Sequence, residues 1–396
     1  MTVGDAVTVV DARALRAGRL ARLQAAIAAG GADACVLFNP ANVRYATGAT
    51  TMTIYCLGSF VRCAVVAPTG EPVLFEHGNS MHLFADIEAD VRPFHAWEFF
   101  DAPDAEAAIW ARETAAALRE LDVPAGGRVA VDKIAPVAHA ALAAEGYTIV
   151  EAGTIVMDAR AVKTPEEIAL ARANGHLVMD MLGAFEAAIV PGVRERDLVA
   201  VLSDVMLRGG GEYLITRGVA SGPTTNPWRQ EATDRPVAEG DLVFVDTDVN
   251  GIEGYFSCVS RTFICGGATP TAAQRATYAI ARDWVLAMHE LIRPGVGFRE
   301  LAERAPQLPD RFRAQRYECV LHSCGLEDEG PSVSYADADQ PNPDRTIEPG
   351  MVVVSEVYLG EVGGSFGVKL GDQLLVTADG IESLAPYPFD PRFAEG

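Results

Sequence analysis

Residues 242–263, with the sequence LVFVDTDVNGIEGYFSCVSRTF, constrain the fold of this chain more than any other segment. The segment opens with an apolar run at 242–245, which is typical of a buried strand. Asp246 and Asp248 follow two residues apart, so both carboxylates would point to one face if the strand continues. Asn250-Gly251 is a hairpin signal, and the rest of the segment then returns as a second strand.

A pair of carboxylates beside a buried strand needs an explanation. Removing a charge from water costs several kcal/mol unless a metal ion or another partner compensates for it. We therefore interpret the segment as a catalytic or metal-binding hairpin. The alternative is a solvated turn, in which Asp246 and Asp248 accept ordinary hydrogen bonds from nearby backbone N–H groups.

Length and charge narrow the class of protein. A chain of 396 residues predicts two domains, each with room for its own core. The net charge of −22 argues against nucleic acid or an anionic membrane as a partner. No apolar run is long enough to span a bilayer, and residues 1–13 lack the pattern of a secretory signal. Seven scattered cysteines do not resemble a disulfide framework, so we expect reduced thiols and a cytoplasmic protein.

Helix and strand patterns alternate through the first part of the chain. This alternation is typical of a layered α/β domain, which we assign to residues 1–158. The apolar periodicity predicts helices at 11–29, 104–121 and 137–145, and strands at 34–38, 61–67, 72–75, 128–131 and 147–150.

A strong helix start marks the second domain, which we assign to residues 159–396. Thr164 is a suitable N-cap, Pro165 fits the first helical position, and Glu167 completes a capping box. Residues 221–231 contain too many turn residues for regular structure, and loops of this kind often line a site. The patterns predict helices at 165–189, 195–207 and 272–291, and strands at 317–322, 351–358 and 367–377. The predicted fold class is therefore mixed α/β (α+β) with two domains.

Several segments resemble the pita-bread family of enzymes, which includes methionine aminopeptidase, aminopeptidase P, prolidase and creatinase. The segment at 42–48, NVRYATG, resembles the N-terminal domain of creatinase and prolidase relatives. The loop at 221–231, the Asp-Thr-Asp hairpin and the Tyr-x4-His-x5-Asp-Glu segment from Tyr317 look like the dimethylsulfoniopropionate lyases of this fold. Peptidases of the family usually have a substrate-binding His where this loop has Trp228. The resemblance implies a creatinase-like N-terminal domain and a C-terminal pita-bread domain.

The same resemblance implies roles for individual residues. Asp328 matches the base that removes the proton next to the substrate carboxylate, and Tyr317 matches its partner in substrate activation. Such a step needs a base within hydrogen-bond reach and positive charge for the enediolate that forms. The alternatives are a capping role for Asp328 and a core aromatic role for Tyr317. The resemblance also assigns His322 and Glu356 to catalysis, and Asp246, Asp248, Trp228 and Cys258 to substrate binding.

The chain departs from the family at two metal-ligand positions. Cys258 stands where the return strand should carry an Asp, and Gly371 stands where the final Glu should precede Asp372. In the family these two carboxylates bridge two metal ions and screen the repulsion between them, which is large at a separation of roughly 3.5–4 Å. Asp372 cannot substitute, because neighbouring residues of a strand face opposite sides. A two-metal site is therefore not expected.

Two states of the site stay open. In the first, no cofactor binds and Cys258 is a small apolar residue. In the second, a single Zn or Fe ion is held by His322, Glu356, Asp248 and Cys258, with the cysteine as a thiolate. We expect the metal-free state. Creatinase has the same fold and works without a metal, so loss of the metal does not imply loss of activity.

The predicted function follows from these expectations. We expect a metal-independent, or at most mono-metal, lyase that cleaves a small amino- or sulfonium-bearing acid after α-proton abstraction. The alternatives are an Xaa-Pro aminopeptidase-like or creatinase-like hydrolase and a catalytically inactive interaction protein. The expected partners are a small-molecule substrate and a second copy of the chain, since family members of this form usually are homodimers. We expect no nucleic acid and no membrane as a partner.

Overall fold

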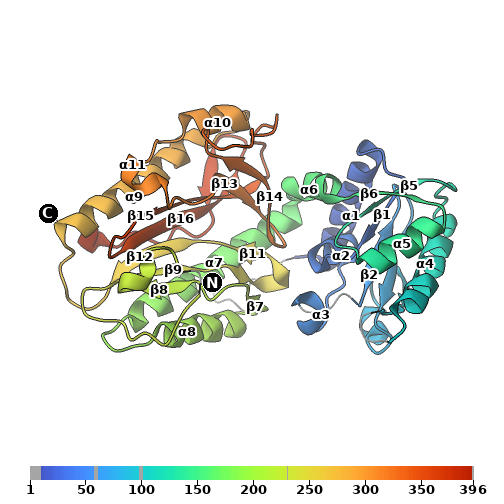
Figure 1. Ribbon diagram of the computed structural model, residues 1–396, viewed down its shortest axis with the longest axis horizontal. Helices are drawn as coiled ribbons and strands as arrows, with labels where there is room; N and C mark the ends of the chain where they lie inside the picture. The colour runs from blue at the N-terminus through green and yellow to red at the C-terminus, as the bar shows by residue number, and fades with distance from the viewer. Residues whose placement is uncertain (1–9, 58–60, 98–100, 230, 395–396) are drawn as a thin grey trace. The chain divides into compact units, whose positions relative to one another are not determined.

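The computed structural model describes residues 10–57, 61–97, 101–229 and 231–394. The chain divides into two compact units, one at Asp11–Arg160 and the other from Ala161 onward, and each has its own sheet and core (Figure 1). The predicted mixed α/β class with two domains is confirmed. The division lies in helix α6, Gly153–Ala161, close to the boundary predicted at 158/159. None of the helices in the described residues is long and apolar enough to cross a membrane.

The N-terminal domain is built on a six-stranded sheet with the order β4-β3-β2-β1-β5-β6. β1 pairs parallel with β5 and antiparallel with β2, and β2 and β3, which lie within or overlap the strands predicted at 61–67 and 72–75, pair antiparallel. The strands are β1 Ala34–Leu37, β2 Cys63–Val66, β3 Val73–Glu76, β4 Asp90–Pro93, β5 Arg128–Val131 and β6 Thr148–Glu151.

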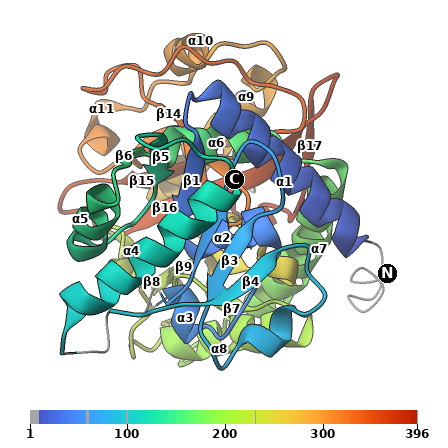
Figure 2. The same ribbon diagram turned by 90° about the vertical axis from the view of Figure 1, so that its right-hand side faces the viewer.

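The helices of this domain lie beside its sheet (Figure 2), and small and aromatic side chains fill the core between them. Trp110 of α4 contacts Phe38, with ring centroids 5.5 Å apart, and both belong to a buried cluster that also includes β2 and β5. The segment at 42–48 forms α2 and stops at Gly48, whose φ of 74° favours glycine. The remaining helices are α1 Ala12–Ala29, α2 Pro40–Thr47, α3 Ile54–Leu57, α4 Pro103–Glu120 and α5 Pro136–Ala144.

The C-terminal domain contains the sheet that carries the candidate site residues. Its strands follow the order β14-β13-β15-β16-β12-β9-β8, and β17 pairs with β16. A separate small sheet has the order β11-β10-β7. The strands are β7 Tyr213–Leu214, β8 Val219–Ser221, β9 Leu242–Asp246, β10 Val249–Asn250, β11 Phe256–Ser257, β12 Ser260–Ile264, β13 Cys319–Cys324, β14 Asp328–Ser334, β15 Val352–Gly360, β16 Gly367–Val376 and β17 Ile381–Ser383.

Five helices complete the described part of this domain. α7 begins with the predicted capping box, in which the Thr164 hydroxyl accepts from the Glu167 N–H and the Glu167 carboxylate accepts from the Thr164 N–H. α9 packs against β15 and β16 through residues such as Trp284 and Met288 (Figure 1). The helices are α7 Pro165–Ala188, α8 Glu195–Arg208, α9 Ala272–Leu291, α10 Phe298–Arg304 and α11 Asp310–Arg313.

The strand predicted to carry both Asp246 and Asp248 does not continue that far. β9 ends at Asp246, and Asp248 has a φ of 30°, outside the extended region. The chain turns there and enters β10, which belongs to the small sheet. The prediction that strand alternation aligns the two carboxylates is therefore wrong, because a turn and not a continuous strand places them.

The loop at 221–231 contains more regular structure than predicted. Ser221 ends β8, and Gly222–Thr225 forms one turn of 3-10 helix. Gln230 lies outside the described residues. The buried Glu195 carboxylate fixes both ends of this loop: Ser221 and Thr224 donate to one oxygen at 2.7–2.8 Å, and Thr233 donates to the other at 2.6–2.8 Å. Through these bonds the first turn of α8 positions the loop that carries Trp228.

Glu195→Gln should destabilise the fold by roughly 2 kcal/mol at pH 7. The substitution replaces one of the two carboxylate oxygens, which accept from Ser221, Thr224 and Thr233, by an amide group that donates. Burial alone would raise the pKa of Glu195, but the hydrogen bonds from Thr233, Thr224 and Ser221 lower it below its ordinary value. A lowered folded-state pKa stabilises the fold above the unfolded pKa, and this contribution is lost as pH falls through the folded-state value.

The destabilisation measured by urea unfolding should therefore shrink between neutral pH and the acid side of about pH 4. The exposed Glu303→Gln is the matched control and should leave stability unchanged at both pH values. A pH-independent effect of Glu195→Gln would contradict the role of the ionised carboxylate.

Candidate active site

Neighbouring strands of the large sheet bring the candidate residues to one face. Glu356 on β15 lies opposite Gly371 on β16, Gly371 opposite Ser260 on β12, and Ser260 opposite Asp246 on β9. Directly paired residues share a face of a sheet, so these four positions form one row across four strands. Lys369 stands two residues before Gly371 and thus projects from the same face.

His322 joins this row from the next strand. It lies on β13 opposite Val354, which is two residues from Glu356 on β15. The Tyr-x4-His-x5-Asp-Glu segment then folds back, because β13 and β14 are an antiparallel pair in which Asp328 lies opposite Cys324. This places Asp328 beside the His322 ring, although the two residues are separated by a turn.

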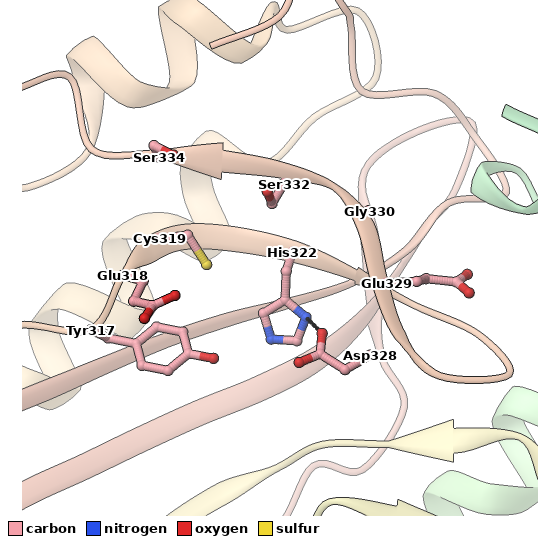
Figure 3. A pocket seen from close by; sticks show the side chains of 9 residues that line it. All are labelled: Tyr317, Glu318, Cys319, His322, Asp328, Glu329, Gly330, Ser332 and Ser334. Carbon is pink, nitrogen blue, oxygen red and sulfur yellow. Dashed lines mark ion pairs between the residues drawn. The ribbon is translucent and has the colours of Figure 1, made fainter. Parts of the chain in front are cut away.

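A pocket of about 310 Å³ opens at this point (Figure 3). Tyr317, His322 and Asp328 line it, and in the figure the Tyr317 hydroxyl and the Asp328 carboxylate lie on either side of the imidazole. Glu329 points away from that ring in the figure, and its carboxylate lies 2.9 Å from the Lys163 ammonium. The remaining lining residues are Glu318, Cys319, Gly330, Ser332 and Ser334.

The imidazole of His322 lies between two carboxylates. Its Nδ1 is 2.8 Å from Asp328 Oδ1, and its Nε2 faces Glu356 Oε1 at 3.4 Å without hydrogen-bond geometry. Burial alone would lower the pKa of His322, but Asp328 and Glu356 raise it to about 10. Asp328 is 58% exposed at the pocket, while Glu356 is fully buried. The three side chains thus connect the pocket to the buried row.

Tyr317 lies next to this group but is not on the predicted strand. β13 begins at Cys319, so Tyr317 belongs to the segment that precedes it. Burial and the nearby Glu356 carboxylate raise the pKa of Tyr317 far above its ordinary value, which keeps it a neutral phenol. Its ring packs against Trp228 with centroids 5.4 Å apart. Within the described residues, Asp328 forms its ion pair with His322, and both Tyr317 and Asp328 line the pocket.

Lys369 is the site residue that sequence reasoning missed. Its ammonium forms ion pairs with Asp246 Oδ2 and with Glu356 Oε2, the latter at 2.9 Å. It also lies 3.9 Å from the centroid of the Trp228 ring and 4.5 Å from that of Tyr317. Burial would lower the pKa of Lys369, but the Asp246 and Glu356 charges raise it, so the side chain stays charged. A lysine two residues from Gly371 was a usable signal, because strand alternation puts both on the same face.

Two further carboxylates near the row, those of Asp248 and Asp372, have different surroundings. Burial and the Asp246 charge raise the pKa of Asp248 to about 7, and the Thr216 hydroxyl donates to its Oδ2 at 2.8 Å. Asp372 points away from the row, as strand alternation predicted. Its oxygens lie 2.6 Å from Arg261 and 3.3 Å from His289.

Two groups of side chains have the spacing of metal ligands. The ligand atoms of Cys258, His322 and Glu356 lie within 4.8 Å of one another, and so do those of Asp246, Asp248 and Cys258. The hydrogen bonds and ion pairs that these atoms already make do not fit a divalent ion. Lys369 holds one oxygen of Asp246 and one of Glu356, and the thiol of Cys258 donates to Asp246 Oδ1 at 3.4 Å. Burial and the Asp246 charge raise the pKa of Cys258 well above its ordinary value, which disfavours a thiolate.

Sequence comparison finds relatives over the whole chain. Residues 169–378 match Metallopeptidase family M24, and residues 19–162 match the Creatinase/Prolidase N-terminal domain. The chain is 36% identical to Dimethylsulfoniopropionate lyase DddP of Roseovarius nubinhibens, covering 96% of this chain and 88% of that protein. It is 34% identical to the protein of the same name from Roseobacter denitrificans, with the same coverage.

Solved structures share the fold at lower identity. A prolidase from Thermococcus sibiricus superposes with a TM-score of 0.77 at 19% identity, covering 94% of this chain and 98% of that one. An Xaa-Pro dipeptidase from Bacillus anthracis gives 0.75 at 20% identity, covering 95% and 99%. These likenesses establish the two-domain fold, and at such identities they carry nothing about the reaction.

Proposed function

Because the chain belongs to Metallopeptidase family M24 and is an enzyme of the pita-bread fold, we propose that it is a lyase acting by α-proton abstraction. The proposed substrate is dimethylsulfoniopropionate or a similar small acid with a sulfonium or amino group, since relatives at 36% and 34% identity carry that lyase name. The observation that carries the proposal is the Asp328 carboxylate, exposed at the pocket and held 2.8 Å from His322.

The reaction balances without an external oxidant or reductant. Asp328 takes the proton from the carbon next to the substrate carboxylate, and the electrons of that C–H bond form the new C=C bond. The bond to the heteroatom on the next carbon breaks, and its electron pair leaves with the heteroatom. A sulfonium substrate therefore gives a neutral thioether, an unsaturated acid and one proton.

The neighbours of Asp328 suit the charge that develops in this step. Negative charge moves onto the substrate carboxylate as an enediolate, and positively charged or neutral hydrogen-bond donors stabilise it. The His322 imidazolium contributes positive charge at the pocket, and the neutral Tyr317 phenol can donate a hydrogen bond there. Glu318 and Asp328 give the pocket negative charge, which attracts a cationic leaving group.

We propose that the enzyme works without a bound transition metal. The support is chemical: the oxygens of Asp246 and Glu356 already accept from an ammonium, and the raised pKa of Cys258 favours the thiol over the thiolate. The hydrolase alternative is less well supported, because peptide hydrolysis on this fold uses a metal-activated water. The prolidase-like structures share the fold alone at 19–20% identity and do not favour it.

We also propose that the enzyme is a cytoplasmic homodimer. Six cysteines of the described residues are free, which fits a reducing compartment. The pocket opens to solvent, and a second subunit over it would exclude water from the reaction. Light scattering at micromolar concentration should give the mass of two chains, and a purely monomeric protein would contradict the proposal.

The protein purified from medium with added iron, manganese and zinc should carry less than about one transition metal per chain. Treatment with a chelator should leave its turnover unchanged, because no step depends on a metal. The test is to measure metal content by elemental analysis and turnover before and after treatment with the chelator. Two equivalents of any divalent metal, or activity lost to the chelator and restored by metal, would overturn metal independence.

Asp328→Asn should lower kcat by roughly 10²–10⁴, the usual contribution of a positioned base, and leave KM nearly unchanged. The amide keeps the size of the carboxylate but cannot take the proton. Release of the thioether from dimethylsulfoniopropionate, followed by gas chromatography, measures the rate.

Cys258→Ser is the matched comparison, because the serine hydroxyl can still donate to Asp246. It should cost far less than Asp328→Asn. An inactive Cys258→Ser enzyme beside an active Asp328→Asn enzyme would transfer the essential role to the thiol.

A further inference from the structure

We propose that the Lys369 ammonium is the resident cation of this active site, in the place where Metallopeptidase family M24 suggests a metal ion. In this reading Lys369 holds the Asp246 and Glu356 carboxylates together and excludes a divalent metal from them. The inference rests on the metal-independent form of the function proposed above, and it makes Lys369 a positioning residue.

The geometry places the ammonium between the carboxylates that a metal would need. Asp246 and Glu356 come from β9 and β15, and both belong to the row in which Ser260 and Gly371 lie between them. Lys369 reaches one oxygen of each, and the Ser260 hydroxyl lies 3.0 Å from Asp246 Oδ1 and 3.1 Å from Glu356 Oε2. All five residues are buried, so water does not screen the charges.

Lysine is rare in this chain, so its presence at position 369 is informative. The chain has 32 basic residues, of which only Lys133, Lys163 and Lys369 are lysines. Lys133 is exposed, whereas Lys163 and Lys369 are buried and paired with carboxylates. An ammonium is a compact point charge, and a guanidinium is a wide planar fork. A compact charge is what two carboxylates around one small space require.

The strand that carries Lys369, β16, has no room for a further ligand at position 371. A Cβ atom at Gly371 would lie 2.4 Å from the Cβ of Glu356, closer than side chains approach. A carboxylate at position 371 would therefore push β15 and β16 apart. The backbone has adapted to a row without that side chain, which leaves Lys369 as the positive charge nearest to Asp246 and Glu356.

The consequence concerns the orientation of Glu356. Lys369 binds its Oε2, and this leaves Oε1 facing His322 Nε2 at 3.4 Å. His322 in turn contacts the proposed base Asp328. Lys369 thus acts on the reaction through Glu356 and His322, and its ammonium also lies over the ring of Tyr317, which lines the pocket.

Removing the ammonium should uncover a metal site. We expect wild-type protein, stripped with a chelator and incubated with Co²⁺, to bind less than about one-tenth of an equivalent. Lys369→Met keeps the length and apolar character of the side chain stem and should bind about one Co²⁺ per chain, a gain of at least tenfold. A thiolate-to-cobalt charge-transfer band should accompany it, because Cys258 lies within 4.8 Å of the other ligand atoms.

Two further variants locate the effect. Lys163→Met also removes a buried, ion-paired lysine from the same domain, but it should gain no Co²⁺, because Lys163 pairs with Glu329 instead. Adding Cys258→Ser to Lys369→Met should abolish the charge-transfer band. Added Co²⁺ should raise the melting temperature of Lys369→Met and leave that of wild type unchanged, because a ligand that binds only the native state stabilises it.

The inference is overturned if folded Lys369→Met takes up no more Co²⁺ than wild type, or if Lys163→Met gains as much. If Lys369→Met does not fold, ¹⁵N-lysine labelling of wild type decides. A hydrogen-bonded ammonium signal from Lys369 that disappears in Lys369→Gln, and persists in wild type with excess Co²⁺, supports the inference, and displacement of that signal by Co²⁺ overturns it.

These outcomes are separate from the lyase assay. Absence of thioether release from wild type would remove the proposed reaction while leaving the cobalt result intact. Thioether release with no cobalt gain in Lys369→Met would leave the reaction and remove the inference.

Discussion

The arrangement of this active site depends on neutralising buried carboxylates. Asp246 and Glu356 are almost fully buried, and an uncompensated charge at either position would cost several kcal/mol. Lys369 and the His322 imidazolium provide the compensating charge within the same domain. Because each of these side chains comes from a different strand, the ion pairs also link β13, β15, β16 and β9 to one another. The buried charges are therefore compensated only when these strands are paired as they are in this sheet.

The register of the sheet explains why such a cluster can form at all. Glu356, Gly371, Ser260 and Asp246 are successive partners across four strands, and a shift of one residue in any pair would turn a member to the opposite face. Asp372 shows the effect of one such step: it lies next to Gly371, yet it pairs with Arg261 on the other side. A side chain of the row therefore cannot be replaced by its neighbour along the strand.

Sequence patterns predicted most of the helices, and together with the family resemblance they pointed to Asp246, Glu356 and Gly371 of the row but not to Ser260. Prediction failed where the backbone leaves regular structure. The capping box at Thr164 and the helix at Ala272–Leu291 were identifiable because their signals are local. Asp248 was assigned to a strand, since alternation carries no sign of a residue with φ of 30°. Lys369 was overlooked because its partners are distant in sequence, and only strand pairing shows that it meets Asp246 and Glu356.

If Lys369 is the cation of this site, the buried row and the pocket lining have separate roles. The buried row is held together by Lys369, so it has little need of charge from a substrate. The pocket, in contrast, is bordered by the exposed Asp328 and by Glu318, and these groups face the solvent from which the substrate comes. For the proposed cationic substrate, recognition would therefore fall to the pocket lining, while the row holds Glu356 against His322. With Cys258 and Gly371 in place of carboxylates, the site is assembled around Lys369, and the proposed substrate-contacting residues Tyr317 and Asp328 still line the pocket.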